Sequence, residues 1–145
     1  GYSDDDKKLL IAHIHSQCLV QMQAAIEEYL LPSLQADCEE KLKSSMESVR
    51  RYRFTESNHL PANIVDCIAF IWNYDDSLRH IFREHRDRKI LDESTEYFWN
   101  HLQRITATDY IPSKEDIINV RYRTTGIIEK EFSIEEHRFH IFDVG

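Results

Sequence analysis

The 145-residue chain lacks most of the features that mark membrane, secreted or nucleic-acid-binding proteins. No apolar run approaches the roughly 20 residues that a membrane-spanning helix needs, and the N-terminus has no signal peptide. The chain does not begin with methionine, so we expect it to start inside a longer protein. Acidic residues outnumber basic ones by 26 to 18, for a formal net charge of −8. Because phosphate binding needs a basic surface, this charge argues against nucleic acid as a partner.

Cysteine is also sparse, and histidine forms no recognisable metal site. The three cysteines, Cys18, Cys38 and Cys67, are odd in number and widely spaced. This pattern favours reduced, partly buried thiols of a cytosolic protein over a disulfide framework or a zinc site. Eight histidines are present, but no pair has ligand spacing supported by a third ligand. The sequence therefore predicts no histidine metal site.

What the sequence does contain, up to about residue 109, is the apolar period of α-helices. Ser3-Asp4-Asp5-Asp6 has the form of a capping box that opens a long first helix. Apolar residues then recur at steps of three or four over about five turns. They are Leu10, Ile14, Cys18, Met22, Ala25 and Tyr29. Pro32 is expected to end or kink this helix, because the residue before a proline avoids the helical region.

Shorter helices are predicted to follow, each with a few residues on its inner face. The first two are residues 37–52, with Leu42, Met46 and Val49 inside, and Ile64 to Trp72, introduced by Pro61. The next two are a helix capped by Asp75 or Asp76, with Leu78, Ile81 and Phe82 inside, and a helix capped by Asp92, with Tyr97, Phe98, Leu102 and Ile105 inside. The last is a short helix opened by a second capping box, Pro112-Ser113-Lys114-Glu115-Asp116. The predicted fold is mainly α, an orthogonal helical bundle with one long central helix and shorter helices around it.

After Gly126 the pattern changes to that of β-strands. Ile128, Phe132 and Ile134 share one face of a first strand, and Phe139 and Ile141 share a face of a second. The sequence thus predicts a C-terminal two-stranded β ribbon. Because two strands alone are marginally stable in water, their apolar faces indicate a larger sheet outside these residues.

Three motifs in the last 37 residues carry the functional signal. They are Asp109-Tyr-Ile-Pro-Ser-Lys-Glu-Asp116, Val120-Arg-Tyr-Arg-Thr-Thr-Gly126 and Phe139-His-Ile-Phe-Asp-Val-Gly145. Taken singly they are weak, since an arginine- and threonine-rich run is usually an exposed loop. Their joint order and spacing resemble those of heterotrimeric G-protein α subunits. A weaker resemblance covers the rest of the chain, including Gly1-Tyr2-Ser3, Trp72 and Leu91-Asp92-Glu93-Ser94.

The resemblance implies a division of the chain and an activity. Residues 1–117 would form the all-helical domain inserted in α subunits, and residues 118–145 would supply switch I and two strands of a Ras-like α/β GTPase sheet. Such proteins are GTP-hydrolysing molecular switches at the inner, cytoplasmic face of the plasma membrane. Their partners are GTP or GDP, the βγ dimer, a seven-helix receptor, GTPase-activating regulators and effectors. The chain has no Gly-x-x-x-x-Gly-Lys-[ST] loop and no Asn-Lys-x-Asp motif, so we expect it to be inactive alone.

The resemblance also implies the site residues. Arg121 matches the catalytic arginine, whose planar fork donates to the phosphates in the transition state. Thr124 and Asp143 would hold Mg²⁺, Asp143 through a water. The implied nucleotide-binding residues are Glu93, Ser94, Ile118, Asn119, Val120, Arg121, Tyr122, Arg123, Thr124, Asp143, Val144 and Gly145. A second hypothesis stays open, in which the helical part is a nucleotide-independent interaction or regulatory module.

Overall fold

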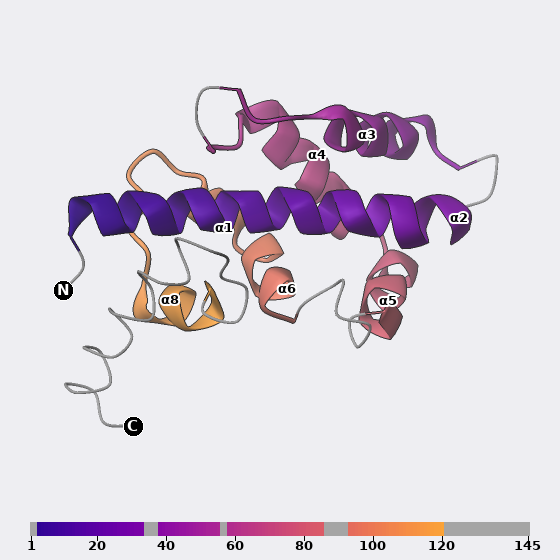
Figure 1. The fold of residues 1–145 in the computed structure, drawn as a ribbon. Helices are drawn as coiled ribbons and strands as arrows, with labels where there is room; N and C mark the ends of the chain where they lie inside the picture. The colour runs from indigo at the N-terminus through magenta and orange to yellow at the C-terminus, as the bar shows by residue number, and fades with distance from the viewer. Residues whose placement is uncertain (1–2, 34–37, 56–57, 86–92, 121–145) are drawn as a thin grey trace.

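The computed structural model describes residues 3–33, 38–55, 58–85 and 93–120, and this part of the chain is helical (Figure 1). The elements are α1 (Asp4–Ala25), the π-helix η1 (Ile26–Leu30), α2 (Leu31–Ser33), α3 (Glu40–Arg51), α4 (Ala62–Trp72), α5 (Asp76–His85), α6 (Glu93–Trp99), α7 (Leu102–Ile105) and α8 (Lys114–Val120). The prediction of a mainly α fold is confirmed. The predicted β ribbon and the predicted cap Asp92 lie outside the described residues.

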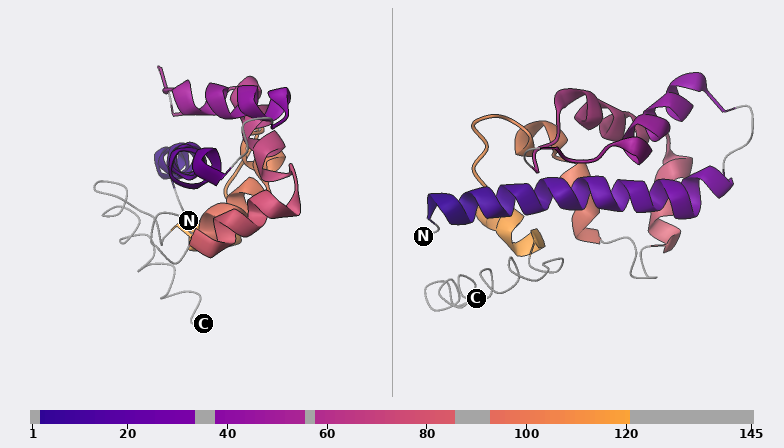
Figure 2. Two further views of the ribbon diagram at one scale, coloured as in Figure 1. Left: turned by 90° about the vertical axis from the view of Figure 1, so that its right-hand side faces the viewer. Right: turned by 45° about the horizontal axis from the view of Figure 1, so that its top comes forward.

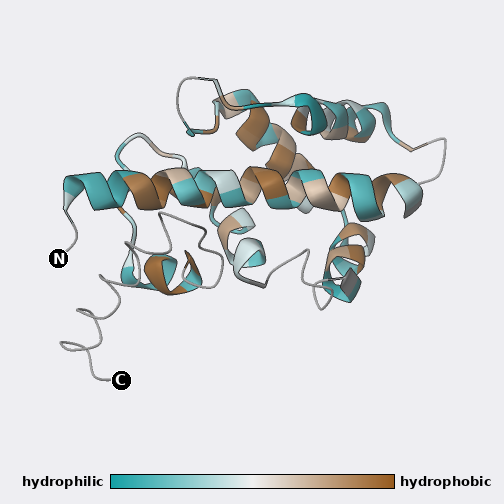
Figure 3. Cartoon of the chain, in the orientation of Figure 1, coloured by the Kyte–Doolittle hydropathy of each residue, from teal (hydrophilic) through white to brown (hydrophobic). Residues whose placement is uncertain are grey.

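The long helix α1 organises the other helices. In Figure 1, α3 and α4 lie on one side of α1, and α8, α6 and α5 follow one another along its other side. Seen end-on in Figure 2, the described helices leave one flank of α1 uncovered, and Val20 of α1 is 52% exposed. Figure 3 shows that α4 is mostly apolar whereas α3 is largely hydrophilic. The apolar α4 therefore lies between the other helices, and α3 covers it from outside.

The start and the inner face of α1 agree with the sequence prediction. The Ser3 hydroxyl accepts from the Asp6 N–H at 3.1 Å, and the Asp6 carboxylate accepts from the Ser3 N–H at 3.3 Å. These two bonds satisfy donors that a helix N-terminus leaves without partners. All six apolar residues predicted for the inner face are at most 8% exposed. The capping box and the apolar stripe of α1 are thus confirmed.

The far end of α1 differs in detail from the prediction at Pro32. The regular α-helix ends at Ala25, and the π-helical turn η1 and the short α2 carry the chain on through Pro32 to Ser33. In a regular α-helix the proline ring would clash with the carbonyl of the residue four positions earlier, here Glu28. Because Glu28 lies within η1, the wider π-turn accounts for how Pro32 is included in the last described helical residues, which end at Ser33.

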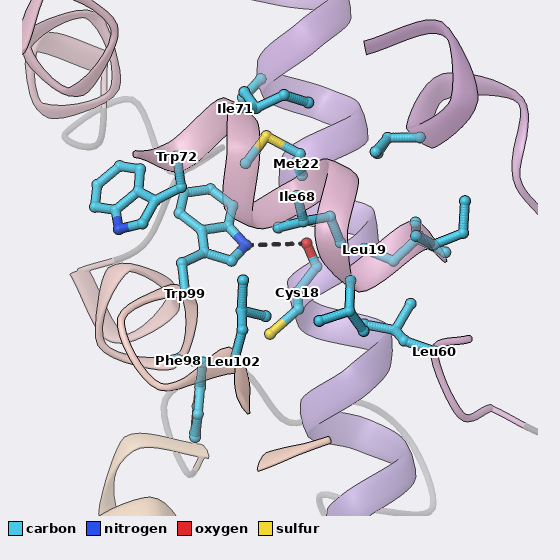
Figure 4. Close-up of a cluster of buried hydrophobic side chains, with 14 of the residues drawn as sticks. Cys18, Leu19, Met22, Leu60, Ile68, Ile71, Trp72, Phe98, Trp99 and Leu102 are labelled. Carbon is cyan, nitrogen blue, oxygen red and sulfur yellow. Dashed lines mark hydrogen bonds between the residues drawn. The ribbon is translucent and has the colours of Figure 1, made fainter. Parts of the chain in front are cut away.

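An aromatic cluster forms the centre of the core, where α4, α5 and α6 meet α1 (Figure 4). The rings of Trp72, Phe82 and Trp99 have centroids 5.0 to 5.3 Å apart. Trp99 is 4% exposed, and its indole N–H donates to the Cys18 carbonyl oxygen at 3.1 Å. Aromatic pairs at this spacing add to the free energy gained by burial, so this cluster joins the four helices.

The helix predicted to run from Asp92 through Ile105 is in fact two helices, so the prediction of one continuous helix is wrong. The backbone leaves helical geometry at His101, whose φ is −126° and ψ is 26°. The Asn100 side-chain oxygen accepts from the Trp72 indole at 2.6 Å, and His101 Nδ1 contacts the Tyr97 carbonyl at 2.7 Å. The His101 ring takes the carbonyl that a continuing helix would offer to the His101 N–H, and this N–H donates instead to the Phe98 carbonyl oxygen at 2.9 Å. This competition accounts for the break between α6 and α7.

The remaining sequence predictions for helices are confirmed with small shifts of their ends. The inner-face residues Leu42, Met46 and Val49 of α3 are all buried. Pro61 is the N-cap of α4. Asp75 rather than Asp76 caps α5, since its Oδ1 accepts from the Leu78 N–H at 2.9 Å.

All three cysteines lie in the described residues and are free thiols, and burial raises the pKa of the Cys18 thiol.

Candidate functional site

One fully buried carboxylate, that of Asp116, lies in the first turn of α8. The Ser113 hydroxyl accepts from the Asp116 N–H at 3.1 Å, and Asp116 Oδ2 accepts from the Ser113 N–H at 2.9 Å. These reciprocal bonds are the second capping box that the sequence predicts, which is confirmed. The carboxylate thus holds the start of the helix that leads to the predicted switch segment.

Three side chains from outside α8 also donate to this carboxylate. The Tyr97 hydroxyl of α6 donates to Oδ1 at 2.7 Å, and the Tyr110 hydroxyl donates to Oδ2 at 2.6 Å. Arg104 of α7 donates through both terminal nitrogens, Nη2 to Oδ1 and Nη1 to Oδ2, each at 2.8 Å. We call Tyr97, Arg104, Tyr110 and Asp116 the Asp116 network. It connects α6, α7 and the segment before α8 to α8 itself.

The Asp116 network is ionic at neutral pH. Burial by itself raises the pKa of a carboxyl group, but the bonds from Arg104, Tyr110 and the other donors outweigh burial here. They hold the pKa of Asp116 well below its usual range. Burial and the bond to Asp116 raise the pKa of Tyr97 to about 12. The carboxylate is therefore an acceptor and the tyrosine a donor across the physiological range of pH.

The network was not foreseen from the sequence, apart from the capping box. Arg104 and Asp116 are 12 residues apart, and Tyr97 and Asp116 are 19 apart. No helical or strand period relates positions at such separations. The only sequence signal for the network was that an arginine and two tyrosines precede, within 19 residues, an aspartate that also caps a helix.

The C-terminal turn of α8 contains three of the predicted nucleotide-binding residues. Val120 is fully buried, whereas Ile118 is 36% exposed. The Asn119 side-chain amide donates to the Glu115 carbonyl oxygen at 2.9 Å, within the same helix. Residues 118–120 therefore continue a helix, and the predicted domain boundary at residue 117 falls inside α8.

Two other predicted nucleotide-binding residues lie at the start of α6. Glu93 is its first residue. Ser94 is 5% exposed, and its hydroxyl accepts from the Gln17 side-chain amide of α1 at 3.1 Å. The same amide donates to the Thr95 hydroxyl at 2.9 Å. The start of α6 is thus attached to the middle of α1.

The predicted catalytic residue Arg121 and the predicted magnesium ligands Thr124 and Asp143 lie outside the described residues. So do the predicted nucleotide-binding residues Tyr122, Arg123, Val144 and Gly145. Within 3–33, 38–55, 58–85 and 93–120, no group of three or more histidine, cysteine, aspartate or glutamate side chains is arranged to hold a metal ion. The structure thus positions α8, the helix that precedes Arg121 in the chain, but not the predicted catalytic and metal-binding residues.

A buried histidine, which the sequence analysis also did not single out, joins three segments. The Leu60 N–H donates to His15 Nδ1 at 3.0 Å, so Nδ1 is an acceptor and the proton lies on Nε2. His15 Nε2 then donates to the Ile105 carbonyl oxygen at 2.8 Å. Burial lowers the pKa of His15, the bond to Ile105 opposes this, and nearby His59 lowers it further. The neutral ring of His15 therefore links α1, α7 and the segment before α4.

Acidification should destabilise the fold through His15. Its folded-state pKa is below the unfolded value of 6.5, so the unfolded state binds more protons below that pH. The stabilising effect of neutral His15 is fully present above pH 6.5 and is lost as pH falls through the folded-state pKa, by at most about 1.4 kcal/mol per pH unit. Urea unfolding at a series of pH values from 7.5 to 5 would measure this loss, and His15→Gln should reduce it.

The matched control for that experiment is His80→Gln. His80 lies on α5 with 71% of its side chain exposed, so its replacement should leave the loss of stability on acidification unchanged. An equal reduction in both variants would contradict the assignment to His15.

Comparison with known proteins identifies the family of the chain. The family model of the G-protein alpha subunit matches residues 1–145, which is the whole chain. The chain therefore belongs to the G-protein alpha subunit family, and this prediction from the sequence is confirmed. The guanine nucleotide-binding protein alpha-16 subunit of Caenorhabditis briggsae is 25% identical over 145 residues, covering all of this chain and 40% of that protein. The chain thus spans about two fifths of the length of this curated relative.

Across the described residues, no helix has the length and apolar character required to cross a membrane.

Proposed function

We propose that the chain is the helical domain, switch I and the next two strands of an α subunit that binds and hydrolyses GTP. The observation that supports this most is the family match over all 145 residues, including the motifs after residue 117. The helical part, with its continuous core, would act as a lid over the nucleotide. The absent phosphate loop and guanine-binding motif would come from parts of the α subunit outside these residues.

Within the proposed site, the residues divide by chemistry. Arg121 would be catalytic, because a guanidinium can donate two parallel bonds to a phosphate. Thr124 and Asp143 offer a hydroxyl and a carboxylate, which are the hard oxygen donors that Mg²⁺ prefers. Bound Mg²⁺ would neutralise charge on the phosphate oxygens. Residues 118–124 and 143–145 would line the nucleotide, and Glu93 and Ser94 would approach it from the helical side.

The proposed partners follow from family membership. The intact α subunit would alternate between states coupled to a βγ dimer and to effectors, under the control of a seven-helix receptor and of GTPase-activating regulators. Such an α subunit would act at the inner face of the plasma membrane.

Nucleotide binding tests the proposal. We expect a fluorescent GTP analogue with Mg²⁺ to bind the intact α subunit that carries these residues. The 145-residue chain alone should bind it far more weakly, because no phosphate loop is present to donate backbone N–H groups to the β- and γ-phosphates.

The two contrary outcomes have different meanings. Tight binding by the 145-residue chain alone would contradict the need for the absent phosphate loop. Binding by neither protein would favour the alternative, a nucleotide-independent helical interaction or regulatory module. A fluorescent ATP analogue serves as the control for specificity, since a guanine-binding protein should discriminate against it.

A further inference from the structure

We infer that the Asp116 network positions Arg121 for GTP hydrolysis, so that Tyr97, Arg104, Tyr110 and Asp116 are positioning residues for the reaction. The inference rests on the proposed function, because it assumes that Arg121 is the catalytic arginine. Its structural basis is α8, which ends at Val120, the residue directly before Arg121 in the chain.

Both ends of α8 are held by the helical core. At the N-terminal end, the buried carboxylate of Asp116 accepts the bonds of the network. At the C-terminal end, Val120 is fully buried and belongs to the hydrophobic core. Between them lies a single short helix, about 10 Å long at 1.5 Å per residue. The point at which the chain leaves this helix towards Arg121 is therefore set by packing at both ends.

The arrangement of the donors resists movement of α8. The Tyr97 hydroxyl comes from α6, the Arg104 guanidinium from α7, and the Tyr110 hydroxyl from the segment before α8. A rotation or shift of α8 that kept one of these bonds would lengthen the others, since the donors come from separate elements. Leaving a buried carboxylate or its donors without partners costs free energy, so α8 has one favoured position.

That position matters for chemistry because catalysis in phosphoryl transfer is mostly placement and electrostatics. If the backbone at Arg121 were displaced, its guanidinium could no longer make both paired hydrogen bonds to the transferred phosphate in good geometry. A structural network distant from the phosphate can in this way influence the rate of hydrolysis, and it does so only through Arg121. Nucleotide affinity, which draws on many other contacts, should change much less.

The test uses the intact α subunit loaded with GTP and followed through a single turnover. Tyr110→Phe removes one donor to Asp116 and keeps the ring, and Arg104→Lys removes the paired bonds and keeps the charge. We expect each to slow hydrolysis about tenfold while the Kd for nucleotide changes less than about twofold. Tyr97→Phe, at a partly exposed position, provides a further variant if either of the first two fails to fold.

The matched control is Ile64→Val, a buried change in α4 that is outside the network. It is to be compared at a temperature where its folded fraction equals that of the network variants, and we expect it to hydrolyse GTP at the wild-type rate. Equal slowing in this control would overturn the inference, because the effect would then be general destabilisation. Wild-type rates in the folded network variants would overturn it as well.

Combining the variants separates this inference from the proposed function. If the network acts through Arg121, then Tyr110→Phe should not slow hydrolysis further in an Arg121→Ala background. A tenfold slowing that persists there would overturn the inference alone. If Arg121→Ala by itself hydrolyses GTP at the wild-type rate, the proposed catalytic role fails, and the inference fails with it.

Discussion

Arg121→Lys is expected to slow GTP hydrolysis by the intact α subunit by about a thousandfold, in line with arginine fingers in general, of which α subunits are the standard example with the arginine in cis. Lysine keeps the positive charge but presents one point donor instead of a planar fork. The loss should appear in the rate of the chemical step, because the bonds to the phosphates strengthen as charge develops in the transition state. Nucleotide binding should remain close to that of the wild type.

Single-turnover hydrolysis with the release of labelled phosphate would measure the effect. Arg83→Lys is a matched control, because Arg83 lies on α5 in an exposed ion pair with Glu96, and such pairs contribute little. It should hydrolyse GTP normally. The motif contains a second arginine, Arg123. If Arg123→Lys stopped hydrolysis and Arg121→Lys did not, the catalytic role would have been assigned to the wrong arginine.

Asp116→Asn should lower the free energy of unfolding by about 3 kcal/mol, as expected for breaking a buried ion pair by changing one partner. Asparagine has nearly the same shape but carries an NH₂ group in place of one oxygen. Donors surround both oxygens of Asp116, so the new amide hydrogens would face other donors. The Arg104 guanidinium would also lose its charged acceptor, although its 41% side-chain exposure lets water compensate in part.

Urea unfolding at pH 7 would measure this loss, with Asp109→Asn as the control. Asp109 is exposed in the segment before α8, so the same chemical change there should alter stability by no more than about 0.5 kcal/mol. The pKa of Asp116 is depressed in the fold. The contribution of ionised Asp116 to the free energy of unfolding is therefore present above the unfolded-state pKa of 3.8. It is lost as the pH falls through the folded-state pKa. A deficit equal to that of Asp109→Asn would contradict the importance of the network.

Local signals account for the parts of the fold that were predictable. Both capping boxes were correct because their partners, Ser3 with Asp6 and Ser113 with Asp116, lie three residues apart. The inner faces of α1 and α3 were correct because burial follows the helical period along one element. The prediction of one helix through residue 105 failed, because the helical period of the apolar residues does not show that the His101 ring takes the Tyr97 carbonyl.

The candidate site likewise has a part that the sequence predicts and a part that it does not predict. The sequence alone identified the family and assigned roles to residues after 117, because motif order and spacing are properties of the linear chain. It could not identify His15, whose two partners are 45 and 90 residues away. Gln17 carried a partial signal, since it lies three residues after Ile14 and thus close to the apolar stripe of α1.

The sequence by itself determined the helical class, the two helix starts that are capping boxes and the membership of the α-subunit family, because each depends on residues close together along the chain. Only the tertiary structure decided which polar groups are buried and what they bind. Asp116 is an ordinary capping residue in the sequence, and it becomes the centre of an ionic network only when α6, α7 and α8 pack together. Hydrogen bonds in the core are made across the fold, and their energy depends on the exclusion of water that packing alone provides.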